Sequence, residues 1–184
     1  MQDLRRTLVG MLAVSLVVSV AVVASALAQR ARVSPRGTVD AHVDGASISM
    51  EYGRPYKRGR VIWGSLVPWS HWWMPGADES TTIKTDAALT FAGTLTMPAG
   101  EYSVYTLPGP DVFKLIIVNQ TGLFHTRYPS DRDLGRVDMT LKKLTEPVEQ
   151  LTFIVEPKEG GGGTFKLAWD DREYSVPFVV KKHP

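Results

Sequence analysis

Apolar and polar residues alternate with a period of two over most of the chain that follows the N-terminal segment, and this is the pattern of half-buried β-strands. Val39, Ala41 and Val43 alternate with polar residues, and a second alternating stretch covers residues 46–52. Between them stands Asp44-Gly45, a strong signal for a hairpin turn. No segment keeps a period of 3.6 residues over eleven residues. We therefore expect strands throughout.

The same alternation continues to the C-terminus and predicts roughly ten short strands joined by polar turns. An apolar run at 112–118, interrupted only by Lys114, is the expected central strand of the core. The glycine-rich residues 160–163 are expected to form a hairpin loop, and Asp170-Asp171-Arg172 is expected to turn between the last two strands. A short helical turn is expected within 129–134. The pattern predicts an all-β fold, a single antiparallel β-sandwich of the jelly-roll kind.

Residues 53–80 interrupt this pattern and show little strand periodicity. Loops of that length in compact domains are usually functional or contain short structure of their own. The segment holds four of the five tryptophans: Trp63, Trp69, Trp72 and Trp73. We expect a long, ordered, Trp-rich loop of the Ω type, packed by its own tryptophans.

The N-terminus has the features of a signal peptide. Arg5 and Arg6 form a short basic region, residues 8–27 are almost wholly apolar, and Ala26-Leu27-Ala28 has the small-x-small shape of a signal-peptidase site. These features predict a signal peptide at 1–28. The domain is then expected outside the cytoplasm, in the periplasm or secreted.

An uncleaved membrane anchor through residues 7–27 is the alternative, because the apolar run is nearly long enough to span a bilayer. We expect a linker at 29–37 and one domain at 38–184. The chain has no cysteine, which excludes disulfides, thiolate metal sites and a lipid-modified cysteine.

The charge of the expected mature chain is nearly balanced. Without residues 1–28, which hold Asp3, Arg5 and Arg6, Lys+Arg falls from 21 to 19 and Asp+Glu from 19 to 18, leaving +1. This balance predicts neither a nucleic-acid binder nor a protein drawn strongly to membranes, so membrane contact is expected only through the N-terminal segment. The basic run 57–60 is expected to be a polar turn.

Trp69, Trp72 and Trp73 suggest a binding platform, because sugar rings pack on exposed tryptophan faces. The alternative is that these side chains fasten the loop to the body of the domain, since tryptophans are highly buried on average. If the segment is extended, adjacent Trp72 and Trp73 face opposite sides, and at least one of them points outward.

Arg54 follows Tyr52-Gly53 and precedes Pro55, at a break where an arginine is well placed to clamp a carboxylate or phosphate. Its alternative is a salt bridge to Asp78 or Glu79. The residues expected to bind a ligand are Tyr52, Arg54, Trp69, Trp72, Trp73 and Glu79.

Catalysis has a weaker basis in this sequence. The residues that suit a hydrolase are Asp78 or Glu79 as acid or base and His71 as proton carrier, but adjacent carboxylates on an extended chain face opposite ways. The chain has no GxSxG motif, no glycine-rich phosphate loop and no metal-ligand spacing of its histidines. We therefore assign no catalytic residue and expect neither a metal nor a cofactor.

Several motifs, in this order, carry a family resemblance: YGRP from Tyr52, the turn Lys57-Arg58-Gly59-Arg60, WGSLVPW from Trp63, W-x-PGA-x-x-x-TT from Trp73, MPAGEYSVYTLPG from Met97 and LIIVNQTGLFHTRY from Leu115. With these motifs the chain resembles the DUF2911 family of bacterial secreted or envelope proteins, from about Ser34 to Val179. The resemblance implies an exported β-sandwich domain and transfers no catalytic residue. Family members commonly have an arginine where this chain has Met74.

Three functions remain open from the sequence. The leading expectation is an extracytoplasmic domain without catalysis that binds a glycan or a small anionic ligand or associates with the cell envelope. The alternatives are a hydrolase acting on envelope polymers and a purely structural module. Exposure of the tryptophans and the partner of Arg54 discriminate between binding and structural roles.

Overall fold

The computed structural model describes residues 33–181, so the expected signal peptide or anchor lies outside the described residues. The all-β expectation is confirmed: these residues form antiparallel strands and contain, besides them, one 3₁₀ turn at Ser130–Arg132 inside the expected range. The strands are β1 (Arg36–Val43), β2 (Ala46–Gly53), β3 (Thr82–Thr85), β4 (Ala88–Phe91), β5 (Leu95–Met97), β6 (Gly100–Leu107), β7 (Phe113–Val118), β8 (Asp133–Pro157) and β9 (Gly163–Lys181).

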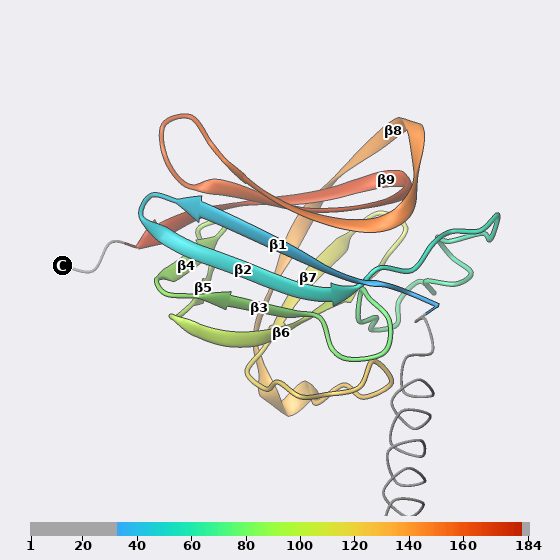
Figure 1. The fold of residues 1–184 in the computed structure, drawn as a ribbon, viewed down its shortest axis with the longest axis horizontal. Coiled ribbons are helices and arrows are strands. Elements are labelled where there is room, and N and C mark those ends of the chain that lie inside the picture. The colour runs from blue at the N-terminus through green and yellow to red at the C-terminus, as the bar shows by residue number, and fades with distance from the viewer. Residues whose placement is uncertain (1–32, 182–184) are drawn as a thin grey trace, which may run out of the picture. The chain divides into compact units, whose positions relative to one another are not determined.

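All nine strands hydrogen-bond into one open sheet, in the order β1-β2-β3-β6-β7-β8-β9-β4-β5 (Figure 1). Every pairing is antiparallel. A sandwich of two separate sheets is therefore not confirmed, because the strong bend of β8 and β9 carries the pairing from one part of the sheet to the other.

The expected central strand is confirmed as β7, which stands fifth of the nine strands. Five of its six residues are buried, which requires apolar cover on both faces. The main core lies on one face and includes Leu115 and Ile117. On the other face, Ile116 and Val118 pack in a smaller cluster with Met74, Tyr105 and Leu123.

The expected turn at Asp170-Asp171-Arg172 is wrong, because β9 runs unbroken through these residues. The hairpin instead joins β8 to β9 through the glycine-rich loop, as expected for residues 160–163. Asp170 has a left-handed φ of 51°, opposite the irregular pairing between Lys143 and Val148. A polar kink in a bent strand breaks the alternation just as a turn would.

The chain that leaves β2 covers an exposed edge of β8. The Leu151 amide donates to the Pro55 carbonyl at 3.0 Å, and the Leu151 carbonyl accepts from Arg54 Nε at 3.3 Å. The Phe153 amide donates to the Tyr52 hydroxyl at 3.1 Å. These bonds occupy backbone groups that an open strand edge would leave free for another chain. We call residues 52–57 the edge clasp.

The Trp-rich loop is part of the folded body. Trp73 and Thr106 exchange both backbone hydrogen bonds, each at 2.8 Å, so the loop runs beside the end of β6 where β3 has ended. Ser70 donates to the Pro108 carbonyl at 2.7 Å, and Ser80 donates to the Leu123 carbonyl at 2.9 Å. The loop is therefore ordered by pairing with the sheet, as well as by its tryptophans.

Candidate functional site

Three of the loop tryptophans form a layer on the main core. Trp63 is 9% exposed and lies parallel to Trp69, with ring centroids 6.4 Å apart. The Trp63 and Trp73 rings meet at a right angle with centroids 6.2 Å apart, and Trp73 stacks on Trp169 with centroids 6.0 Å apart. Half-buried Trp69 and Trp73 thus fasten the loop to the body.

Trp72 lies on the opposite side of the extended segment, as the alternation predicted. It packs against Tyr128 at 5.4 Å, next to the smaller cluster, and His71 lies on it at 5.3 Å. Trp72 is half-buried and His71 is exposed. Burial raises the pKa of Tyr128, and its hydroxyl donates to Asp133 at 2.7 Å, so the surroundings of Trp72 are tightly packed.

Tyr52 and Arg54 both serve the edge clasp. Tyr52 is buried in the main core. The Arg54 stem crosses Gly37, where an added Cβ would come within 2.2 Å of it, and Nη2 donates to Thr152 Oγ1 at 3.1 Å. The alternative of a salt bridge to Asp78 or Glu79 is not among the contacts of Arg54 within residues 33–181, because its side chain is bonded to β8.

The residues that suited a hydrolase face different neighbours. His71 lies on Trp72, and Asp78 has a left-handed φ of 65° with its carbonyl accepting from the His125 amide at 3.0 Å. Glu79 accepts from Arg36 at 3.5 Å. This arrangement gives no support to a shared acid–base site.

Two hollows lie on the outer face of β1, β2 and β3. One has a volume of about 370 Å³ and the other about 310 Å³. Both are lined by Ser49 and Lys84, so they are neighbours on the sheet, and we call the two together the outer groove. Strand alternation produces it, because Ser49 and Lys84 are opposite each other on adjacent strands and point away from the core.

The outer groove is lined by charged side chains and carries an excess of negative charge. Arg36 lies between two carboxylates, 3.2 Å from Glu51 and 3.5 Å from Glu79. Ser47 donates its amide to Asp86 at 2.8 Å, and this backbone hydrogen bond lowers the pKa of Asp86. The charged lining comprises five carboxylates and two permanent cations: Asp40, Glu51, Glu79, Asp86 and Glu101, with Arg36 and Lys84.

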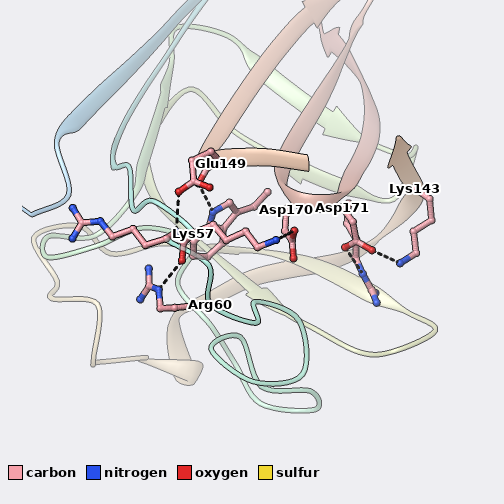
Figure 2. Close-up of polar contacts among 9 residues, drawn as sticks. Lys57, Arg60, Lys143, Glu149, Asp170 and Asp171 are labelled. Atoms are coloured by element: carbon pink, nitrogen blue, oxygen red, sulfur yellow. Dashed lines mark hydrogen bonds and ion pairs between the residues drawn. The ribbon is translucent and has the colours of Figure 1, made fainter. Parts of the chain in front are cut away.

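A second charged region lies at the expected turn in residues 57–60, which is confirmed: Arg58 and Gly59 have φ of 50° and 70°, and the Arg60 amide donates to the Lys57 carbonyl. Figure 2 shows this turn beside the bend of β8 and β9. Lys57 binds Asp170 at 2.5 Å, and this bond raises the pKa of Lys57.

Further contacts fix the same region. The Arg58 amide donates to Glu149 at 2.8 Å, and Lys143 pairs with Asp171 at 2.8 Å (Figure 2). Arg172 lies over the Trp69 ring at 5.0 Å. We call this region the basic corner, because its cations outnumber its carboxylates: Lys57, Arg58, Arg60, Lys143 and Arg172 against Glu149, Asp170 and Asp171.

Of the six residues expected to bind a ligand, only Glu79 lines the outer groove. Arg36, Ser49 and Lys84 were missed because no motif marks them. The one signal in the sequence was the alternation of polar and apolar residues in β2 and β3. It places the polar residues Ser49, Glu51 and Lys84 on the solvent face.

Two negative findings apply to residues 33–181. No three His, Asp or Glu side chains there gather in a way that could hold a metal ion. In the same part of the chain, no helix has the length and apolar character needed to cross a bilayer.

A comparison with protein families matches residues 34–178 to the model described as a protein of unknown function, DUF2911. The chain belongs to this family. The match covers most of the chain, and the resemblance carried by the YGRP and PGA motifs is thereby confirmed. Neither the curated proteins nor the solved structures gave a match.

Two motifs of the DUF2911 domain have a structural explanation. A Cβ on Gly53 of the YGRP motif would lie 2.3 Å from the Ala77 carbonyl oxygen, so the PGA motif packs backbone to backbone on the end of β2. A Cβ on Gly76 would lie 2.6 Å from Thr81 Oγ1. Met74, between Trp73 and the PGA motif, is buried in the smaller cluster.

Proposed function

We propose that this domain binds a ligand without catalysis, outside the cytoplasm, and that its outer groove takes a segment of a glycan. The observation that supports the proposal is a pair of neighbouring hollows that share Ser49 and Lys84 and are lined by charged side chains. An extended, open depression of this kind suits a chain molecule better than an enclosed cofactor, which is usually held in an apolar cavity.

The chemistry of the lining supports a polyhydroxylated ligand. Sugar hydroxyls both donate and accept hydrogen bonds, and the groove offers carboxylate acceptors beside the donors Arg36 and Lys84. An anionic ligand is disfavoured at this surface, because carboxylates outnumber cations there and like charges repel. We therefore propose a neutral or amine-bearing glycan in place of a small anion.

The proposed location follows from the N-terminal sequence alone. A basic start, a long apolar run and a small-x-small site at Ala26-Leu27-Ala28 are typical of exported proteins. A domain without cysteine folds equally well in an oxidising compartment. Glycans of the cell envelope are then within reach of the groove.

A thermal-shift screen against neutral, amine-bearing and acidic glycans tests this function. A ligand present at about a hundred times its Kd adds about 2.7 kcal/mol of stability, which raises Tm by several degrees in a domain of this size. Lys84→Ala is expected to abolish the shift, because Lys84 lines both hollows. Lys142→Ala, an exposed lysine on β8, is the matched control and is expected to keep it.

Recovery of the glycan separates binding from catalysis. We expect chromatography of the bound glycan to return it unchanged after prolonged incubation, and cleaved product would favour the hydrolase. A Tm shift with acidic glycans alone, or one that persists in Lys84→Ala, would show that the ligand binds outside the outer groove.

A further inference from the structure

The Trp-rich loop presents two apolar side chains to solvent. Val61 is 68% exposed and Leu66 is 42% exposed. The Leu66 amide donates to the Val61 carbonyl at 3.3 Å, so the two residues stand side by side across a tight turn. Figure 1 shows this part of the loop projecting from the strands beside the ends of β1 and β2. We call residues 60–67 the loop tip.

The loop tip is rigid, because its inner residues are fully buried. Ile62 and Val67 are both 0% exposed, and the Val67 amide donates to the Ile62 carbonyl at 2.9 Å. Trp63 anchors the same turn in the aromatic layer. The exposed pair is thus held outward by a packed base, so its apolar surface is available to a partner at little conformational cost.

Cations stand directly beside this apolar pair. Arg60 is exposed, and among residues 33–181 its guanidinium donates to the carbonyls of Tyr56 and Lys57 and forms no ion pair. Its charge is therefore positioned but not neutralised by a carboxylate. Arg58, also exposed, adds a second guanidinium within the same turn.

We propose that the loop tip docks on a lipid bilayer whose surface carries anionic headgroups. Val61 and Leu66 enter the interfacial region, while Arg60 binds headgroup phosphates. A soluble acidic polymer would engage Arg60 but leave the exposed apolar pair in water, so the combination favours a bilayer. This contact is independent of the glycan proposal, which concerns the outer groove, and of any N-terminal anchor.

A single reporter cysteine tests the docking, because the chain has none of its own. The full chain carrying Leu66→Cys is labelled with an environment-sensitive dye and mixed with vesicles. The vesicles contain either phosphatidylcholine alone or equal parts phosphatidylcholine and phosphatidylglycerol. We expect a blue shift of the dye emission, and quenching by a lipid-borne quencher, with the anionic vesicles only.

Two matched variants control for simple tethering by the N-terminal segment. Val179→Cys places the dye on another exposed apolar position, 53% exposed on β9, and is expected to give no shift. Arg60→Glu in the Leu66→Cys background is expected to abolish the shift, whereas Lys142→Glu is expected to keep it. A thermal melt of each variant confirms that it is folded.

The proposal is overturned by an unshifted dye at position 66 in anionic vesicles. Equal shifts in both kinds of vesicle, or equal shifts at positions 66 and 179, also overturn it, because tethering alone would explain them. A dye shift that appears with polyglutamate but not with anionic vesicles would show that the loop tip binds an acidic polymer and not a bilayer.

Discussion

The outer groove and the basic corner are built from the same kinds of charged residue, but they differ in whether these side chains join separate parts of the fold. In the groove, Arg36 and Lys84 stand on the free face of a sheet whose core is packed without them. In the corner, Lys57 binds Asp170 and so joins the loop to the bend of β9. Lys84 is therefore available to a ligand, whereas Lys57 is already used by the fold.

The aromatic layer under the basic corner gives the largest expected effect. Trp63→Ala should lower the free energy of unfolding by about 3–5 kcal/mol, because it removes a buried indole that meets Trp69, Trp73 and Tyr174. Urea denaturation measures the change, with Lys84→Ala as the groove control, expected within about 0.5 kcal/mol of wild type. Equal effects from the two substitutions would remove the distinction between the regions.

The edge clasp gives the second-largest expected effect on stability. Arg54→Ala should cost about 1.5–3 kcal/mol, because the Leu151 carbonyl and Thr152 hydroxyl lose a charged donor. Arg54→Lys should recover only part of the loss, since one ammonium cannot reproduce the guanidinium geometry. If Arg54→Ala left the urea midpoint unchanged but removed glycan binding, Arg54 would belong to a ligand site after all.

The basic corner should lose stability at alkaline pH. The pKa of Lys57 is raised above its ordinary 10.5 by its hydrogen bond to Asp170. The stability that Lys57 adds is therefore complete at pH values below its pKa in the unfolded chain. It is lost as pH rises through the pKa of Lys57 in the folded protein. We expect the Tm difference between wild type and Lys57→Met to shrink between about pH 9 and pH 12. A constant difference over that range would assign the effect to packing of the lysine stem.

The outer groove should respond at the opposite end of the pH scale, and more weakly. The Ser47 amide lowers the pKa of Asp86 below its ordinary 3.8, so this carboxylate stabilises the fold above that value and ceases to do so as pH falls through its folded pKa. We expect the Tm difference between wild type and Asp86→Asn to shrink as pH drops from about 6 to about 2. Parallel Tm curves for the two proteins would contradict this assignment.

Local signals predicted much of the fold. Asp44-Gly45 gave the β1–β2 hairpin because two adjacent left-handed residues, with φ of 50° and 87°, match the twist of a tight hairpin. The run of apolar residues at 115–118 predicted β7, because a strand covered on both faces has apolar residues at consecutive positions. The continuity of β9 was not predictable in this way, since Asp170-Asp171-Arg172 is polar whether the chain turns or bends.

The candidate site was far less predictable. Arg54 finds its partners 97 and 98 residues away, so no local pattern distinguishes the clasp from a salt bridge to Glu79. The outer groove depends on the register that sets Ser49 beside Lys84. The Trp-rich segment was the conspicuous feature, yet its tryptophans are used mainly in packing, and the groove arises from residues that no motif singles out.

The pairing of Trp73 with Thr106 has a consequence for how the loop opens. Segments without regular strands usually fray separately, and their amides exchange with deuterium long before those of the core. Here the Trp73 amide is bonded to the end of β6, so its exchange is tied to the opening of the sheet itself. A protease that needs extended substrate would then find the middle of this loop as resistant as a strand.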